Sequence, residues 1–346
     1  MSGPCDPFLV PRRVAMVLAL TLLVFGLWGG LVRVGWTVPD TATEIVTMHG
    51  VVMVLGFLGT LISLERAAAI RRGWAFVAPA AAFAGASSLL LGAPLEVGGS
   101  LLALGGGVLV AVLVHLLRLQ PTLHGGVLAA GAVLWVGGVG VWLAGRPLLD
   151  VVPWLGGFLV LTIAGERLEL SRMSRLTPAR RAAFLVACAV FVAGLVLSVG
   201  AFVPGLRTAG AGLVLLALWL GANDVARRTV RRPGLTRFIA LALLAGYAWL
   251  GVAGVLWVRD AAVVAGPGRD AMLHALFLGF VMSMIFAHAP VIVPAVVGVA
   301  VPWRPAFYAH LALLHASLVL RVAADAAGAA ALVRWGGLLN LVAVLV

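Results

Sequence analysis

The sequence contains no lysine, although 24 of its 346 residues are basic, and every one of those 24 is arginine. Charge of either sign is scarce, because only 10% of the residues are Asp, Glu, Lys or Arg, against about 25% in ordinary soluble domains. Hydrophobic residues make up 63% of the chain. This composition excludes a water-soluble domain with a single core and indicates a protein embedded in a lipid bilayer.

Cysteine is almost absent, since the chain has only Cys5 and Cys188. Two cysteines exclude a disulfide-rich secreted scaffold and a four-cysteine metal site. The net charge of +12 is typical of proteins that bind nucleic acid. Here, however, the arginines lie in short gaps between apolar runs and not on a polar face. We therefore expect the lipid bilayer as partner and no nucleic acid.

Apolar runs of about 20 residues, the length that crosses a bilayer core about 30 Å thick, recur along the whole chain. They predict an all-α polytopic membrane protein with about 12 transmembrane helices. The first run is too long for the hydrophobic region of a cleavable signal peptide. In the last run Arg334 leaves only residues 336–346 as the uncharged part, too few to cross, which predicts a longer natural chain or an incomplete helix. The expected spans are 14–35, 45–64, 74–92, 97–117, 125–145, 148–166, 182–203, 207–225, 236–258, 271–290, 306–323 and 331–346.

The arginines also predict the orientation of the chain. If the N-terminus lies inside, seventeen arginines fall on the cytoplasmic side and seven on the outer side. Short cytoplasmic loops of membrane proteins carry such an excess of positive charge. We therefore expect a multi-pass protein of a bacterial-type inner membrane with a cytoplasmic N-terminus.

An internal repeat connects the second, sixth and tenth spans. Residues 56–66 and 157–167 agree at six of eleven positions without a gap, and Gly279-Phe280 repeats the start of both segments. All three spans run from outside to inside, so the similarity recurs every four helices. This pattern predicts one membrane domain, residues 1–346, built from three parallel four-helix repeats at about 14–117, 125–225 and 236–346.

Two of the repeated segments end on a Glu-Arg pair near the inner end of a span. The pairs are Glu65-Arg66 and Glu166-Arg167. Charged side chains at helix ends usually reach toward the membrane surface, so we expect both pairs to be interfacial. The functional alternative is a point where protons enter.

The seven histidines are the main candidates for chemistry, because an ionisable group inside a bilayer is costly. His49 and His274 lie about one turn inside the outer ends of the second and tenth spans, at the same depth. In a closed ring of repeats both imidazoles would face the centre, as two axial ligands of a haem iron require. The alternative is an ordinary hydrogen bond between helices.

The second span also carries a motif. Residues 48–53 read Met-His-Gly-Val-Val-Met and resemble the His-Gly-x-x-Met signature of subunit I of the haem-copper oxidases. The resemblance implies twelve helices in three four-helix arcs and an inside N-terminus. It also implies a low-spin haem, expected to be haem b, on His49 and His274.

Several departures from that family narrow the expected function. The sixth and seventh spans, which supply copper ligands in the family, contain Glu166 and Cys188 but no histidine, and Met272 replaces the ligand of the active-site haem. The tyrosine of helix 6 is absent as well. The chain is more similar to the divergent NnrS-type proteins, which are linked to nitric oxide metabolism. This implies electron transfer to or from a redox partner, or binding of nitric oxide or another diatomic gas; the alternative is a divergent membrane oxidoreductase similar to nitric oxide reductase.

A second group of histidines is expected nearer the cytoplasm. His288 and His310 enter their spans at similar depths, and His115 or Cys188 would join them. Such a set would hold copper or relay protons. The alternative for His288 is a hydrogen bond to backbone carbonyls.

The two prolines after His288 bear on this alternative. Pro290 and Pro294 are expected to end or kink the tenth span, which would free carbonyl oxygens for the imidazole. A different class of function, a transporter for a metal ion or a small solute, would use His288, His310 and His315 as its path.

Two outer arginines complete the candidate residues. Arg321 and Arg334 lie near the outer ends of the last two spans, where they would pair with haem propionates. The alternative is that they anchor the helices at the interface beside Trp335.

Overall fold

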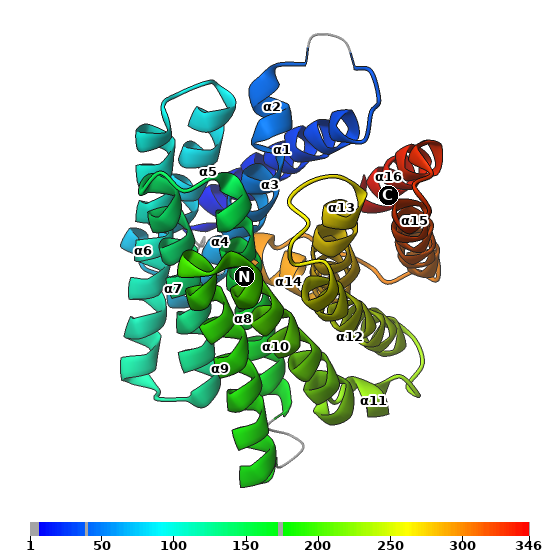
Figure 1. Ribbon diagram of the computed structural model, residues 1–346. Helices are drawn as coiled ribbons and strands as arrows, with labels where there is room; N and C mark the ends of the chain where they lie inside the picture. The colour runs from blue at the N-terminus through cyan, green and yellow to red at the C-terminus, as the bar shows by residue number, and fades with distance from the viewer. Residues whose placement is uncertain (1–6, 39–40, 172–175, 346) are drawn as a thin grey trace. The chain divides into compact units, whose positions relative to one another are not determined.

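The computed structural model describes residues 7–38, 41–171 and 176–345, and every regular element in these ranges is a helix. Within them, eleven helical stretches are long and apolar enough to cross a bilayer, and one further apolar helix at the C-terminal end is shorter. The prediction of a polytopic all-α membrane protein with about 12 helices is confirmed. Figure 1 shows these helices in chain order.

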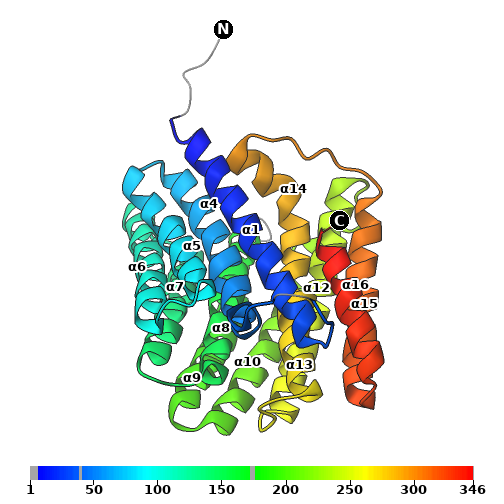
Figure 2. The ribbon, with the colours of Figure 1, turned by 90° about the horizontal axis from the view of Figure 1, so that it is seen from above.

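The first compact unit consists of Met1–Arg33, Thr37–Leu155 and Pro290–Pro302. Within it, α1 and α5 lie against η1, while α6 packs on both α5 and α7. The neighbouring α5 and α6 are seen in Figure 2. Its complete elements are α1 (Leu9–Arg33), α2 (Thr43–Thr47), α3 (His49–Val51), η1 (Val52–Gly59), α4 (Thr60–Ile70), η2 (Gly73–Phe76), α5 (Val77–Leu90), α6 (Leu95–Leu119) and α7 (Leu123–Leu143).

The second compact unit consists of Val34–Trp36, Gly156–Ala289 and Trp303–Val346. Here α10 packs against both α9 and α12, and α15 packs against α13 and α16. Its complete elements are α9 (Pro178–Gly200), α10 (Phe202–Asn223), α11 (Ala226–Thr229), α12 (Leu235–Arg259), α13 (Pro267–His274), η4 (Ala275–Met282), α15 (Phe307–Ala327) and α16 (Ala330–Leu345).

Two helices, α8 (Leu148–Leu170) and α14 (Ser283–Val297), belong to both units. The division falls after Leu155 in α8 and after Ala289 in α14. Proline removes a backbone donor from a helix, and each helix carries proline near the division, Pro153 and Pro290. The two units do not follow the three expected repeats, which stay a prediction.

Of the two effects expected of the prolines in the tenth span, an end of the helix is wrong, and a kink stays a prediction. Instead, α13, η4 and α14 form one stretch, Pro267–Val297, and Pro290 and Pro294 both lie inside α14. Proline is tolerated inside membrane helices because neighbouring groups and local adjustments satisfy the backbone atoms that it leaves unbonded.

The second span begins later than expected. Residues Thr43–Thr47 form the separate helix α2, and Met48, with φ −88° and ψ 3°, interrupts the helical path before α3. The span then continues through η1 and α4 until Arg71, whose positive φ of 53° ends the helix. A left-handed residue at this position is a common helix stop.

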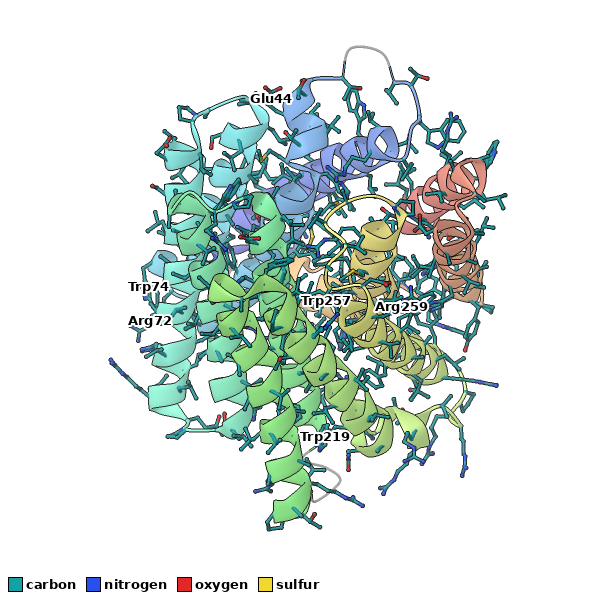
Figure 3. All side chains as sticks on the ribbon, in the orientation of Figure 1. Glu44, Arg72, Trp74, Trp219, Trp257 and Arg259 are labelled. Carbon is teal, nitrogen blue, oxygen red and sulfur yellow. The ribbon has the colours of Figure 1, made fainter. Side chains whose placement is uncertain are left out.

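Glycine allows α10 and α12 to approach closely. A Cβ on Gly210 would lie 2.7 Å from the carbonyl oxygen of Gly254 and 2.8 Å from the Cβ of Trp257, the α12 residue labelled in Figure 3. A Cβ on Gly254 would in turn lie 2.7 Å from the carbonyl oxygen of Gly210. Small residues of this kind are what bring membrane helices into backbone contact.

We expect Gly254→Ala to destabilise the protein by about 1–3 kcal/mol, because the new methyl group overlaps the α10 backbone. Thermal unfolding of the purified protein in detergent measures the effect. Gly251→Ala, on the same helix, is the matched control, since its Cβ would meet only the Cβ of Ala217 at 3.6 Å. Equal melting temperatures for the two variants would contradict this account of the packing.

Candidate functional site

Two π-helical segments accompany the two candidate haem ligands. Both η1 and η4 are eight residues long and contain Leu-Gly-Phe, at residues 55–57 and 278–280, in the same position within the segment. π-Helices are rare in proteins, and those that occur are often found at functional sites. This shared local structure is a further similarity between the second and tenth spans. It also shows a difference in register, because His49 precedes its π-helix by three residues and His274 by one.

His49 packs tightly against α1. Its Nδ1 lies 2.6 Å from the carbonyl oxygen of Gly26, and a Cβ on Gly30 would lie 2.8 Å from its Cε1. Because a carbonyl oxygen only accepts hydrogen bonds, this contact places the proton of a neutral imidazole on Nδ1 and the lone pair on Nε2.

His274 is held by an aspartate one turn earlier on α13. Its Nδ1 lies 3.0 Å from Oδ1 of Asp270 and 2.9 Å from the carbonyl oxygen of the same residue. The neutral imidazole therefore again has its lone pair on Nε2. A carboxylate behind a histidine is the arrangement that orients many metal ligands.

Arg321 connects α15 to this aspartate. Its Nε and Nη2 donate to the two carboxylate oxygens of Asp270 at 2.7 and 2.8 Å. A bidentate pair of this kind fixes both side chains. The expected partner of Arg321 was a haem propionate, but in the structure its charge is paired with a carboxylate of the protein.

Arg334 lies in an aromatic cluster near the start of α16. Its guanidinium is 5.0 Å from the ring centre of Trp36, and Trp36 Nε1 donates to its carbonyl oxygen at 3.0 Å. The ring of Trp335 packs edge-on against Trp36. These contacts are those of a residue that anchors a helix at the membrane interface, the alternative considered for Arg334.

The inner histidines have separate surroundings. His288 Nδ1 lies 2.6 Å from the carbonyl oxygen of Met284, within α14. The His310 ring packs against three phenylalanine rings, with that of Phe286 at 4.7 Å. His315 accepts a hydrogen bond at Nδ1 from Trp249 Nε1, at 3.1 Å. Each of the three inner histidines thus contacts a different neighbour within the second unit.

The expected copper site has no ligand set in the described part of the chain. His115 lies in the first unit with its ring edge-on to Trp74, and Cys188 is a buried thiol of α9 in the second unit. Across residues 7–38, 41–171 and 176–345, no group of three or more His, Cys, Asp and Glu is placed to hold a metal ion. The copper site and the proton path stay predictions.

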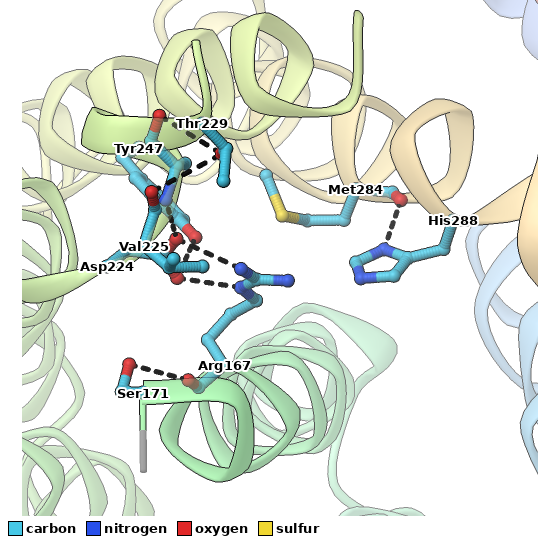
Figure 4. Close-up of polar contacts among 9 residues, drawn as sticks. Arg167, Ser171, Asp224, Val225, Thr229, Tyr247, Met284 and His288 are labelled. Atoms are coloured by element: carbon cyan, nitrogen blue, oxygen red, sulfur yellow. Dashed lines mark hydrogen bonds and ion pairs between the residues drawn. The ribbon is translucent and has the colours of Figure 1, made fainter. Parts of the chain in front are cut away.

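A buried charged cluster in the second unit was not predicted. Arg167 Nε and Nη2 donate to the two oxygens of Asp224 at 2.8 and 2.9 Å, and the hydroxyl of Tyr247 donates to Asp224 at 2.9 Å. The side chains of Arg167 and Asp224 are only 3% and 0% exposed. Figure 4 shows the guanidinium between this aspartate and the side chains of Met284 and His288. The prediction of an interfacial Arg167 is wrong, because Asp224 neutralises its charge inside the protein.

The other predicted pair is different. Arg66 Nη2 lies 3.6 Å from Oε1 of Glu65, and both side chains are partly exposed, at 16% and 28%. This contact agrees with the predicted interfacial pair Glu65-Arg66. An exposed ion pair of this kind contributes little to the free energy of unfolding.

Residues 12–346 match the sequence pattern of DUF8744, a family described as a domain of unknown function. The chain belongs to the DUF8744 family. No curated protein matches it. Because the description of the family names no function, we infer the function of this DUF8744 protein from the polar groups buried among its helices.

We expect Asp224→Asn to destabilise this DUF8744 protein by about 3–5 kcal/mol, because it leaves the Arg167 guanidinium buried without a counter-charge. Thermal or denaturant unfolding in detergent measures the loss. Asp260→Asn is the matched control, since Asp260 pairs with the largely exposed Arg259 and its loss should cost at most about 1 kcal/mol. If both variants lose the same stability, the cluster does not have this role.

Proposed function

We propose that this protein binds a haem in the membrane through His49 and His274 and uses it for electron transfer or for binding nitric oxide or another diatomic gas. The observation that carries the proposal is common to both histidines. In each, an oxygen acceptor engages Nδ1, which leaves the lone pair of the neutral imidazole on Nε2. Nε2 is a nitrogen through which histidine ligates a metal.

The surroundings of both side chains fit this role. Gly30 of α1 leaves room for the imidazole of His49, and the carbonyl oxygen of Gly26 contacts its Nδ1, so the ring is fixed by packing as well as by its hydrogen bond. Asp270 orients the ring of His274, and Arg321 fixes Asp270 in turn. A ligand that is held in this way loses little conformational freedom on binding a metal.

The pairing of His49 with His274 rests on the sequence, that is, on their common depth and on the resemblance to the haem-copper oxidases. Haem b would supply an iron centre that exchanges one electron. If His49 and His274 both held the iron, no ligand position would be left for a gas, so electron transfer with a redox partner is the favoured role. Gas binding would require one histidine to leave.

The location of the protein belongs to the same proposal. The excess of arginine on one side supports a bacterial-type inner membrane with the N-terminus in the cytoplasm. With this orientation both histidines lie in the outer half of the membrane. A redox partner on the outer side of the membrane would then lie nearer to the haem than a cytoplasmic one would.

We expect the purified protein to show an intense Soret absorption band, which is lost or shifted in His49→Ala and in His274→Ala because each variant removes one axial ligand. Absorption spectra of the protein from haem-supplemented cells measure this. His124→Ala is the control, because His124 lies at the start of α7 beside Thr122 and is not a proposed ligand.

Two results would contradict the proposal. One is a colourless, folded protein that contains no haem in a chemical assay. The other is a Soret band that stays the same in both ligand variants, since the haem would then bind elsewhere.

A further inference from the structure

The loop between α10 and α12, residues 224–234, carries a dense group of positive charges in the second unit. Its one acidic residue, Asp224, is buried, whereas its arginines are all exposed. These arginines are Arg227, Arg228, Arg231 and Arg232. Figure 3 shows nitrogen-ended side chains that project outward from the loop that carries α11. The loop therefore presents a strongly basic surface.

No carboxylate of the chain neutralises this surface. Asp224 already holds the guanidinium of Arg167 with both of its oxygens. Arg227 Nη1 donates to the carbonyl oxygen of Ala222 at 2.9 Å, and a carbonyl group carries no full charge. Within the described residues, no ion pair joins one of the four loop arginines to Asp or Glu. The charges of the loop thus lack a counter-charge from the protein itself.

The fold also holds the four guanidinium groups near one another. Arg231 follows Arg227 by four positions, and Arg232 follows Arg228 by the same interval. Hydrogen-bonded turns run through residues 225–232, so the backbone winds as in a short helix. Like charges four positions apart on a helix repel each other. An anion bound beside them would relieve this repulsion.

The inner side of the loop is fixed by buried contacts. The N–H of Ala226, a residue with 0% exposure, donates to Oδ1 of Asp224 at 2.7 Å. After the loop, Phe238 of α12 is buried and packs edge-on against the ring of Tyr308. The arginines are thus presented by an ordered backbone, which lowers the entropy that must be lost when a ligand binds.

The position of the loop relative to its helices indicates the kind of anion. Both α10, which ends at Asn223, and α12, which begins at Leu235, are long and apolar enough to cross a bilayer. The loop therefore lies where the apolar core ends and the lipid headgroups begin. Arginine suits this level, because its apolar stem packs on hydrocarbon while its charge reaches the headgroups.

The start of α12 adds to the positive charge. Arg237 is exposed and lies in the first turn of this helix, which contains no acidic residue. The N-terminal end of a helix itself carries partial positive charge. A negative charge near the loop would therefore be attracted by both.

We propose that the loop between α10 and α12 binds the phosphate groups of anionic phospholipids in the surrounding bilayer. Guanidinium groups bind phosphate oxygens through two parallel hydrogen bonds, and four neighbouring arginines would contact more than one headgroup. A soluble anion offers the same chemistry, but the level of the loop favours lipid. The surface contains neither His49 nor His274, so it does not depend on the proposed haem.

Native mass spectrometry of the purified full chain tests the proposal. The protein is kept in detergent with equal amounts of phosphatidylglycerol and phosphatidylcholine that carry the same acyl chains. We expect the wild-type protein to bind phosphatidylglycerol about tenfold more tightly, because each arginine near an anionic headgroup adds to the attraction. This preference should decrease when the ionic strength is raised, since salt screens exposed charges.

Variants locate the surface. Replacing all four loop arginines by glutamine should remove most of the preference, and the double variant Arg231→Gln/Arg232→Gln should remove part of it. The matched control loses the same charge from four exposed arginines elsewhere in the chain and should keep the preference. This control combines Arg72→Gln, Arg118→Gln, Arg207→Gln and Arg304→Gln.

Four results would overturn the proposal. The first is equal binding of the two lipids by the wild-type protein, which is readable even if a variant does not fold. The second is an unchanged preference in the fourfold loop variant, and the third is an equal loss in the control, since overall charge would then be the cause. The fourth is complete displacement of phosphatidylglycerol by inorganic phosphate at constant ionic strength, which would indicate a site for a soluble anion. A haem-free protein that keeps the lipid preference would contradict the proposed function and leave this proposal intact.

Discussion

A charge inside the bilayer must be neutralised by another part of the protein, because lipid offers neither water nor counter-ions at that depth. This constraint explains the most ordered polar contacts of the chain. Arg167 and Asp224 form a bidentate pair between α8 and the end of α10, and Arg321 and Asp270 form a second one between α15 and α13. The remaining side chains of these helices are mostly apolar and meet either each other or lipid.

The two ion pairs differ in what they leave unsatisfied. Around Asp224, the hydroxyl of Tyr247 and the backbone N–H of Ala226 complete the hydrogen bonds of the carboxylate, so the cluster is closed. Around Asp270 the same kind of pair is extended by a histidine. A closed cluster stabilises a fold, whereas a cluster with an additional ionisable group is suited to binding or exchanging a charge. For this reason we place the proposed chemistry at His274 and not at Arg167.

The π-helical segments fit this division between structural and functional parts. A π-helix has a wider turn than an α-helix, and it survives where the gain at a site offsets the loss in backbone stability. Here it follows His49 and His274, while the segment of α8 with the similar sequence, which has no histidine, is α-helical throughout. Among these three spans, the two with a candidate haem ligand are thus the two with a π-helical segment.

The sequence alone predicts about 12 spans and places several of their limits to within a few residues, as for 97–117 against Leu95–Leu119 and 236–258 against Leu235–Arg259. The second and tenth spans end later than predicted, at Ile70 and Val297. Hydrophobic run length is a local property, and a bilayer requires the same length of every helix. It also singled out His49, His274 and Arg321 as polar groups of apolar spans.

Which of these groups meet depends on the tertiary structure. Arg167 and Asp224 are 57 positions apart, and Arg321 and Asp270 are 51 apart, so no local pattern connects the partners. The course of α14 through two prolines likewise depends on neighbouring groups that satisfy the backbone. The physical reason is that helix formation in a membrane follows from the chain's own hydropathy, whereas pairing of buried charges depends on how the helices pack.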